Sequence, residues 1–139
     1  MPSYRRITPV SVVLIPTIDS DGRQGCVVGE RGIEPQLGQF ALPGGFIEFG
    51  ETAENGAIRE VMEETGFAVA DLRFIRSDPT PHGLLLMFFR ARLVMEAGLE
   101  FRSSIECPSY KIIYQPEELA FPLHTKIIEE YFHGLKSVR

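Results

Sequence analysis

Residues 44–67 read GGFIEFGETAENGAIREVMEETGF and contain six glutamates but a single arginine. From Thr52 onward the apolar residues recur at helical spacing, which predicts a helix of about fourteen residues. Thr52 is suited to cap the N-terminus of this helix, and Gly66 stands where a left-handed residue would end it. The stretch therefore predicts a short acidic helix that glycines flank on both sides.

The predicted helix has two different sides, because successive residues turn by about 100°. The side expected to pack carries Ile58, Val61, Met62 and Thr65. The opposite side is expected to carry Glu60, Glu63 and Glu64. Like charges three and four residues apart destabilise a helix by roughly a few tenths of a kcal/mol per pair. A solvated acidic face is the simplest interpretation, and a cation-binding face is the functional one.

Three neighbouring features favour the cation-binding interpretation. Arg59 lies four residues before Glu63 and can orient that carboxylate as a bidentate donor. Glu51 precedes the helix and can fold back toward the same arginine. Gly44 and Gly45 carry no side chain, so a backbone carbonyl can approach a site closely there.

The donors in this stretch are carboxylates and a main-chain carbonyl, all of them hard oxygen ligands. Such ligands suit Mg²⁺ or Mn²⁺ better than zinc. Mg²⁺ is commonly shared between a few carboxylates and the phosphates of a substrate. We therefore expect a phosphate ester or anhydride as the substrate.

The rest of the chain predicts a mixed α and β protein without regular βαβ alternation. Two strands, Val10–Thr17 and Gly25–Gly29, are expected to form a hairpin. Further strands are expected at Phe40–Leu42, Leu72–Arg76, Leu84–Leu93 and Tyr110–Tyr114, with an amphipathic helix over Leu123–Leu135. The long segment Glu96–Ser109 is predicted to be a loop, and loops of that length are often functional.

The quoted stretch resembles the signature of the Nudix hydrolases, GX5EX7REUXEEXGU, in which U is a bulky apolar residue. Every specified position from Gly45 to Phe67 is matched. The segments GQFALPG at 38–44 and PEEL at 116–119 also resemble their counterparts in that family, although Phe40 stands where the family often has tryptophan. The resemblance implies an α/β (α+β) fold class, an α/β/α sandwich around a mixed β-sheet.

The resemblance also implies an activity, the metal-dependent hydrolysis of a nucleoside diphosphate linked to another moiety. Glu60 and Glu64 would be the principal ligands of Mg²⁺ or Mn²⁺, with Glu63 as a further ligand and the Gly44 carbonyl as a backbone ligand. Arg59 and Glu51 would orient these ligands.

Glu106, in the long loop, matches the acidic position that family members often place after the signature. It would be a metal ligand or the general base, and an exposed loop glutamate is an equal alternative. Glu96 and Glu100 are weaker candidates for the same role.

Residues 77–85, SDPTPHGLL, loosely resemble the SQPWPFP array of NADH pyrophosphatases, without its glutamine, tryptophan and phenylalanine. The sequence therefore favours ADP-ribose or an NADH-like substrate. An oxidised nucleoside triphosphate is one alternative, and a domain that senses nucleotides without hydrolysing them is another. His82, a lone loop histidine, is expected at the surface, and His124 and His133 are expected to be structural or exposed.

The 139 residues fit one domain, 1–139, and the net charge of −5 argues against a polymeric nucleic acid as partner. Cys26 and Cys107 show no disulfide or zinc spacing, and no apolar run is long enough to cross a membrane. We expect a cytoplasmic protein that binds a small nucleotide and no membrane. The family resemblance adds a possible homodimer.

Overall fold

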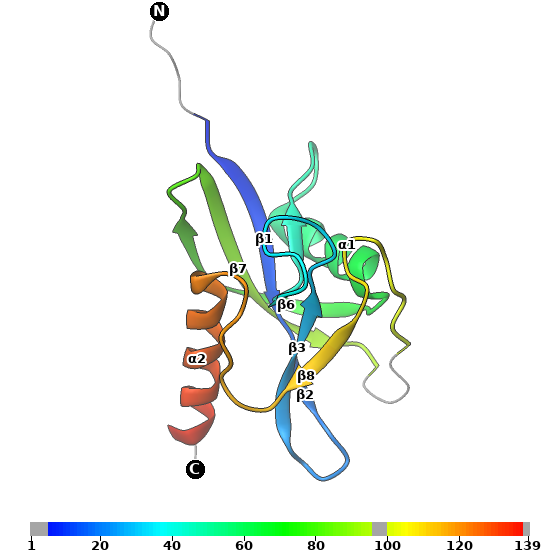
Figure 1. The fold of residues 1–139 in the computed structure, drawn as a ribbon. Helices are drawn as coiled ribbons and strands as arrows, with labels where there is room; N and C mark the ends of the chain where they lie inside the picture. The colour runs from blue at the N-terminus through cyan, green and yellow to red at the C-terminus, as the bar shows by residue number, and fades with distance from the viewer. Residues whose placement is uncertain (1–5, 96–99, 138–139) are drawn as a thin grey trace, which may run out of the picture.

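The computed structural model describes residues 6–95 and 100–137. Two sheets lie between two helices, with α1 and α2 on opposite sides (Figure 1). The elements in chain order are β1 (Thr8–Leu14), β2 (Pro16–Ile18), β3 (Gln24–Glu30), β4 (Phe40–Ala41), β5 (Gly44–Phe46), α1 (Ala53–Thr65), β6 (Val69–Pro79), β7 (Leu84–Leu93), β8 (Tyr110–Ile113) and α2 (Pro122–Ser137).

The first sheet has the strand order β5-β1-β7-β6, and the second is centred on β3, which pairs with β2, β4 and β8. Strand β1 runs parallel to β7 and antiparallel to β5, so the first sheet is mixed. The predicted α/β/α sandwich around a mixed sheet is confirmed.

Strand β1 contributes to two apolar cores because its alternate side chains point to opposite faces of the sheet. Val12 and Leu14 pack in the core that includes Ile128 of α2. Val13 packs in the core that includes Val61 of α1. Each helix therefore covers its own side of the sheets.

Helix α1 begins and ends as its local sequence predicts. The Thr52 hydroxyl accepts a hydrogen bond from the Asn55 amide at 3.0 Å. Gly66 has a φ of 80° in the left-handed region, and its amide donates to the Met62 carbonyl at 2.9 Å. Both capping predictions are confirmed.

The predicted packed side of α1 is only partly right. The buried residues of the helix are Gly56, Ala57, Val61 and Thr65. Met62 is 36% exposed, so its predicted burial is wrong. A Cβ on Gly56 would meet Glu51 and Ile47, so the helix buries its Gly56 side against the preceding loop and leaves Met62 toward solvent.

Two predicted strands have different bounds in the structure. The predicted strand 10–17 is two strands, because the chain passes from the first sheet to the second at Ile15, and only β2 pairs with β3. The predicted strand 72–76 is part of the longer β6, which contains register shifts and a positive φ of 54° at Asp71.

Strand β5 lies where no strand was predicted from the sequence. It pairs with β1 at Val10, Ser11 and Val12, and a Cβ on Gly44 would overlap the Ser11 carbonyl oxygen, so glycine lets the two backbones approach closely. Residues 100–109 of the predicted long loop form no helix or strand. No helix in the part of the chain that the structure describes is long and apolar enough to cross a membrane.

Candidate active site

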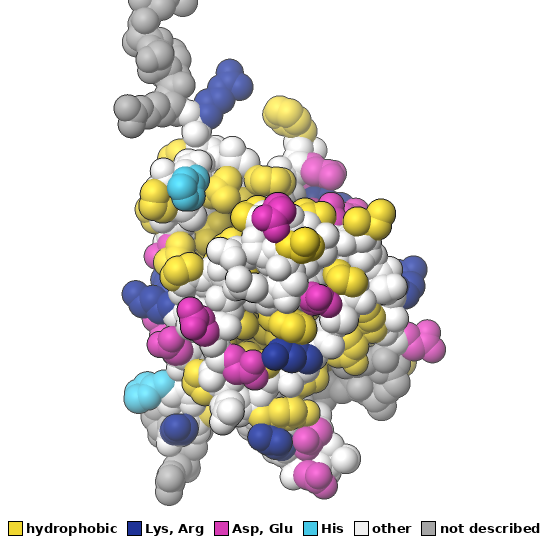
Figure 2. All heavy atoms as spheres, in the orientation of Figure 1, with side chains coloured by type: hydrophobic (Ala, Val, Ile, Leu, Met, Phe, Trp, Pro, Cys, Tyr) yellow, Lys and Arg dark blue, Asp and Glu magenta, His cyan; other side chains and the backbone are white. Residues whose placement is uncertain are grey.

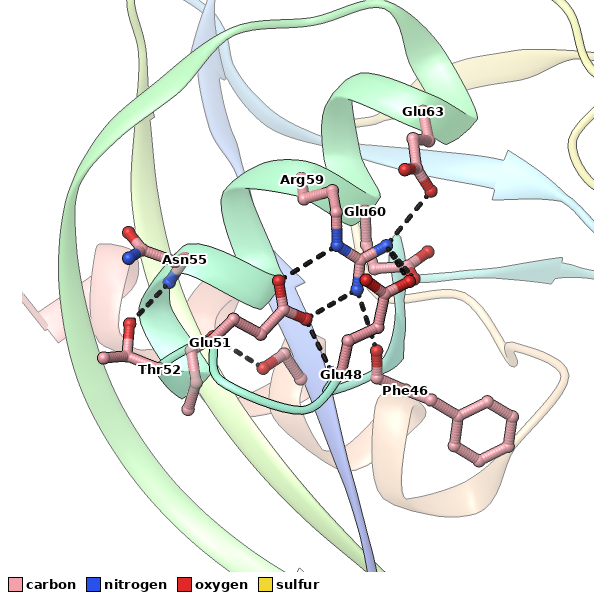
Figure 3. A network of polar contacts seen from close by, with 10 residues as sticks. Phe46, Glu48, Glu51, Thr52, Asn55, Arg59, Glu60 and Glu63 are labelled. Carbon is pink, nitrogen blue, oxygen red and sulfur yellow. Dashed lines mark hydrogen bonds and ion pairs between the residues drawn. The ribbon is translucent and has the colours of Figure 1, made fainter.

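Arg59 is the centre of a charged network at the start of α1 (Figure 3). Its Nε donates to Glu51 Oε2 at 3.0 Å and its Nη2 to Glu51 Oε1 at 2.7 Å, so the guanidinium grips this carboxylate with two bonds. The bidentate partner predicted from the sequence was Glu63, and this is wrong. Glu63 receives one hydrogen bond, from Arg59 Nη1 at 3.1 Å.

The same guanidinium has three further partners. Nη1 donates to Glu60 Oε1 at 2.8 Å and lies 3.5 Å from Glu48 Oε1. Nη2 donates to the Phe46 carbonyl at 3.0 Å. Sequence reasoning found no role for Glu48. In the structure the Glu48 amide donates to Glu51 Oε1 at 2.7 Å. The spacing of three residues between the two glutamates is typical of such a turn.

This network fixes the ionisation of Glu51 and Arg59. The hydrogen bonds from Arg59 lower the pKa of Glu51 to about 2, and the Glu48 amide adds to the effect. The bonds to Glu51 raise the pKa of Arg59 above its usual range. Both groups are therefore charged at neutral pH, and the loop before α1 is tied to the helix.

Glu60 and Glu64 lie on the inward side of α1, one helical turn apart and in line with Gly56. The prediction that Glu60, Glu63 and Glu64 share one face opposite the packed side is only partly right, because the Glu60 side chain is 13% exposed and that of Glu63 is 59% exposed. A Cβ on Gly45 would overlap the Glu60 carboxylate. Glycine in β5 thus leaves the space into which this carboxylate turns.

The carboxylates of Glu60 and Glu64 are partly shielded from solvent and lie close enough to repel each other. Burial, and after it the charge of Glu60, raise the pKa of Glu64 to about 8. A hydrogen bond from the Gly44 backbone opposes this shift. Burial also raises the pKa of Glu60, against the hydrogen bond from Arg59. Arg59 compensates Glu60 but forms no ion pair with Glu64 among its partners, which are Glu48, Glu51, Glu60 and Glu63.

Glu106 comes from the segment before β8 and is exposed, as one of the two alternatives expected, and its charge acts on the same cluster. Its negative charge raises the pKa of both Glu60 and Glu64. Its backbone carbonyl accepts a hydrogen bond from the Gly32 amide at 2.9 Å. The backbone carbonyl of Glu100 lies beside Gly66, which ends α1 two residues after Glu64.

The remaining candidates lie apart from the cluster or outside the described residues. Glu96 is outside the described residues. His82 is exposed in the turn between β6 and β7, and His133 is exposed on α2. His124 is buried, and its Nδ1 accepts a hydrogen bond from the Leu42 amide at 3.2 Å.

The carboxylates offer the right chemistry for a hard divalent cation. Within residues 6–95 and 100–137, no three acidic, histidine or cysteine side chains converge closely enough to hold a metal ion as they stand. Glu60, Glu64 and Glu106 nevertheless interact electrostatically, because charges act over longer distances than ligand bonds. An all-oxygen set with uncompensated negative charge fits Mg²⁺ or Mn²⁺.

Comparison with known proteins places the chain in a family. The NUDIX domain family model matches residues 8–133. The chain belongs to the Nudix family. The ADP-ribose pyrophosphatase of Methanocaldococcus jannaschii is 32% identical to the Nudix chain over 132 residues, which cover 92% of this chain and 76% of that protein.

Two further proteins are similar to this Nudix chain. The NAD-capped RNA hydrolase NudC of Salmonella typhi is 37% identical over 84 residues, which are 60% of this chain but 30% of NudC. The chain therefore spans less than two thirds of the length of that relative. The crystal structure of a NUDIX hydrolase from Nitrosomonas europaea superposes with a TM-score of 0.82 at 25% identity, covering 99% of this chain and 76% of the other.

Proposed function

We propose that this Nudix protein hydrolyses the pyrophosphate bond of a nucleoside diphosphate linked to another moiety, with ADP-ribose or an NADH-like molecule as substrate and Mg²⁺ or Mn²⁺ as cofactor. The observation that carries the proposal is the pair of inward carboxylates, Glu60 and Glu64, which repel each other beside β5. The similarity to an ADP-ribose pyrophosphatase supports the choice of substrate.

Each residue of the cluster has a role in this proposal. Glu60 and Glu64 hold the cation, Glu106 adds a third negative charge, and the exposed Glu63 assists from the rim. Arg59 keeps Glu60 in place and binds the loop through Glu51. Gly44 supplies backbone contacts beside Glu64. A bound divalent cation would neutralise the pyrophosphate and activate water for attack at phosphorus.

Phe46 is our candidate for contact with the nucleobase. Its side chain is 59% exposed, and it pairs with Val10 at the edge of the first sheet. Its carbonyl is bound by Arg59, which fixes the backbone beside the charged network, while the ring points away from that network (Figure 3). Stacking of a base on an exposed aromatic ring contributes about 1–3 kcal/mol, which suits recognition of adenine.

A panel of nucleotides with Mg²⁺ tests the proposed function. ADP-ribose and water are expected to give AMP and ribose 5-phosphate, and NADH is expected to be cleaved at the same bond. Products are separated by chromatography. Preferential turnover of an oxidised nucleoside triphosphate would contradict the substrate assignment. Binding of nucleotides without turnover of any of them would contradict the activity and favour a nucleotide sensor.

We also propose a single domain, 1–139, in the cytoplasm, with a small nucleotide as its partner. The two buried free thiols, Cys26 and Cys107, support a reducing compartment. On the face shown in Figure 2, basic side chains are scattered among acidic ones, which supports a small nucleotide over polymeric nucleic acid. The homodimer stays a prediction that size-exclusion chromatography can test.

A further inference from the structure

The segment Ser104–Ser109, which carries Glu106, lies along the end of β3 and the residues that follow it. The Glu30 amide donates to the Ser109 carbonyl at 2.9 Å, and the Gly32 amide donates to the Glu106 carbonyl at 2.9 Å. The Ser109 hydroxyl donates to Glu30 Oε1 at 2.8 Å. Backbone and side-chain bonds therefore hold the segment at Glu106 itself and at Ser109.

Two glycines leave the space that this segment occupies. A Cβ on Gly32 would overlap the Ile105 carbonyl oxygen and would lie 2.9 Å from Pro108 Cδ. A Cβ on Gly29 would lie 2.8 Å from Cys107 Sγ. Because backbone atoms of the segment touch Gly32, a larger residue there must displace the segment as a whole.

We infer that Gly32 is a positioning residue for the reaction, because its missing side chain seats the segment that carries Glu106, the third acidic group proposed to act with Glu60 and Glu64. Gly32 lies outside the Nudix signature, which begins at Gly45. The contact between Gly32 and Glu106 is direct, through the hydrogen bond between amide and carbonyl. This inference rests on the proposed function of Glu106 and extends it to the residue that holds it.

A double-mutant cycle tests whether Gly32 acts through Glu106. With ADP-ribose and Mg²⁺, Gly32→Ala and Glu106→Gln are each expected to lower kcat by about 10- to 100-fold, since small displacements of catalytic groups cost up to that factor. The double variant is expected to match Glu106→Gln alone. Multiplied losses in the double variant would overturn the inference, because independent sites add in free energy.

Mn²⁺ binding provides a readout that does not depend on turnover. In titrations followed by electron paramagnetic resonance without nucleotide, both single variants are expected to weaken Mn²⁺ binding to the same degree, and the double variant no further. If the wild type hydrolyses none of the nucleotides, the proposed function fails while this titration still decides the role of Gly32. Unchanged Mn²⁺ binding in Gly32→Ala would overturn the inference that Gly32 positions Glu106.

Cys107 reports whether the segment has moved. Its side chain is 3% exposed in the wild type, so iodoacetamide should label it slowly. Gly32→Ala should speed this labelling, while Gly134→Ala, whose Cβ meets no atom within 4 Å, should not. Fast labelling of Cys107 together with wild-type kcat would contradict the inference, because the segment would then be displaced without consequence.

Ser109→Ala covers the case in which Gly32→Ala does not fold. This variant removes the hydroxyl bond to Glu30 without adding any atom. We expect its kcat and Mn²⁺ affinity to fall about threefold, which is within the usual range for the loss of one part-buried hydrogen bond. Combined with Glu106→Gln it should add no further loss, and a further loss would contradict the inference. Thermal melts establish that each variant is folded.

Discussion

The two helices cover opposite sides of the sheets and do so with different chemistry. Helix α2 contributes large apolar side chains to its core, namely Ile127, Ile128, Tyr131 and Phe132. Helix α1 buries smaller residues, namely Gly56, Ala57, Val61 and Thr65, and turns Glu60 and Glu64 inward beside them. Helix α2 therefore mainly stabilises the fold, whereas α1 buries less apolar surface and instead positions the acidic cluster.

This difference has a physical basis. Burial of apolar side chains stabilises a fold by about 1.5–3 kcal/mol for each large residue. A partly buried carboxylate without a paired charge has the opposite effect, because it loses hydration. Changes in α1 should therefore affect activity more than stability, and changes in α2 should do the reverse.

Glu64→Gln should give the largest effect. Loss of one charge from the cluster is expected to lower kcat on the order of 1,000-fold, the equivalent of several kcal/mol of lost electrostatic stabilisation. The melting temperature in metal-free buffer at pH 7 should stay equal, because burial keeps Glu64 largely protonated there and glutamine is likewise uncharged. Steady-state kinetics with Mg²⁺ and thermal melts measure both.

Glu54→Gln is the matched control for this experiment. Glu54 is exposed in the first turn of the same helix, so the kcat of Glu54→Gln should equal that of the wild type. A Glu64→Gln protein with wild-type turnover, or one that melts far below the wild type, would remove the contrast between the helices.

Ile128→Ala should give the reverse result. Ile128 is fully buried, and truncation of a buried isoleucine costs about 3 kcal/mol of unfolding free energy. The kcat of the protein that remains folded should not change. Urea denaturation measures the loss, with the exposed Lys126→Ala as control, for which less than about 0.5 kcal/mol is expected. A matching fall in kcat would show that α2 also serves the site.

Arg59→Lys sharpens the comparison within α1. Lysine keeps the charge but cannot donate two parallel hydrogen bonds to Glu51 and one to the Phe46 carbonyl. We expect kcat/KM to fall about 10-fold and the Mg²⁺ concentration for half-maximal activity to rise. The exposed Arg73→Lys on β6 should change neither. Wild-type kinetics in Arg59→Lys would mean that charge alone suffices.

His124 of α2 gives a pH dependence of stability. Burial lowers the pKa of this histidine to about 3, and the charge of Arg31 adds to the shift. Below about pH 6.5 the unfolded chain takes up a proton that the folded protein excludes. The contribution of neutral His124 to the free energy of unfolding is therefore fully present above pH 6.5. It should fall by up to about 1.4 kcal/mol per pH unit toward pH 3.

His124→Gln isolates this contribution from the carboxylates that also titrate in acid. Glutamine can still accept from the Leu42 amide but does not titrate. Urea melts from pH 7 to pH 4 should show a shallower loss of stability in the variant. Equal slopes for the two proteins would mean that His124 is protonated in the folded state.

Local features of the site could be predicted from the sequence, because they depend on short-range contacts. Thr52 and Gly66 end the helix as expected, and Arg59 reaches Glu63 four residues on. The bidentate bond to Glu51 was not foreseen, since the loop before α1 takes its shape from tertiary contacts.

Which carboxylates turn inward could not be read from helical spacing. Glu60 is buried because β5 pairs with β1, which brings Gly45 beside the helix. Nor could spacing show that the strand predicted at 10–17 divides at Ile15, because β-branched residues suit either sheet. Pairing between distant segments decides both, and a single sequence does not display it.

The parallel pairing of β1 with β7 also affects how the protein is made. Thr8 pairs with Leu84, so β1 can complete its pairing only after β7 has been synthesised. A ribosome adds about 5–20 residues per second, so this takes roughly 4–15 seconds after β1 is made. Pairings of this range form slowly. During synthesis the apolar side chains of β1, including Val12 and Val13, lack β7 as cover. The yield of folded protein in a cell is therefore expected to depend on the rate of translation and on chaperones.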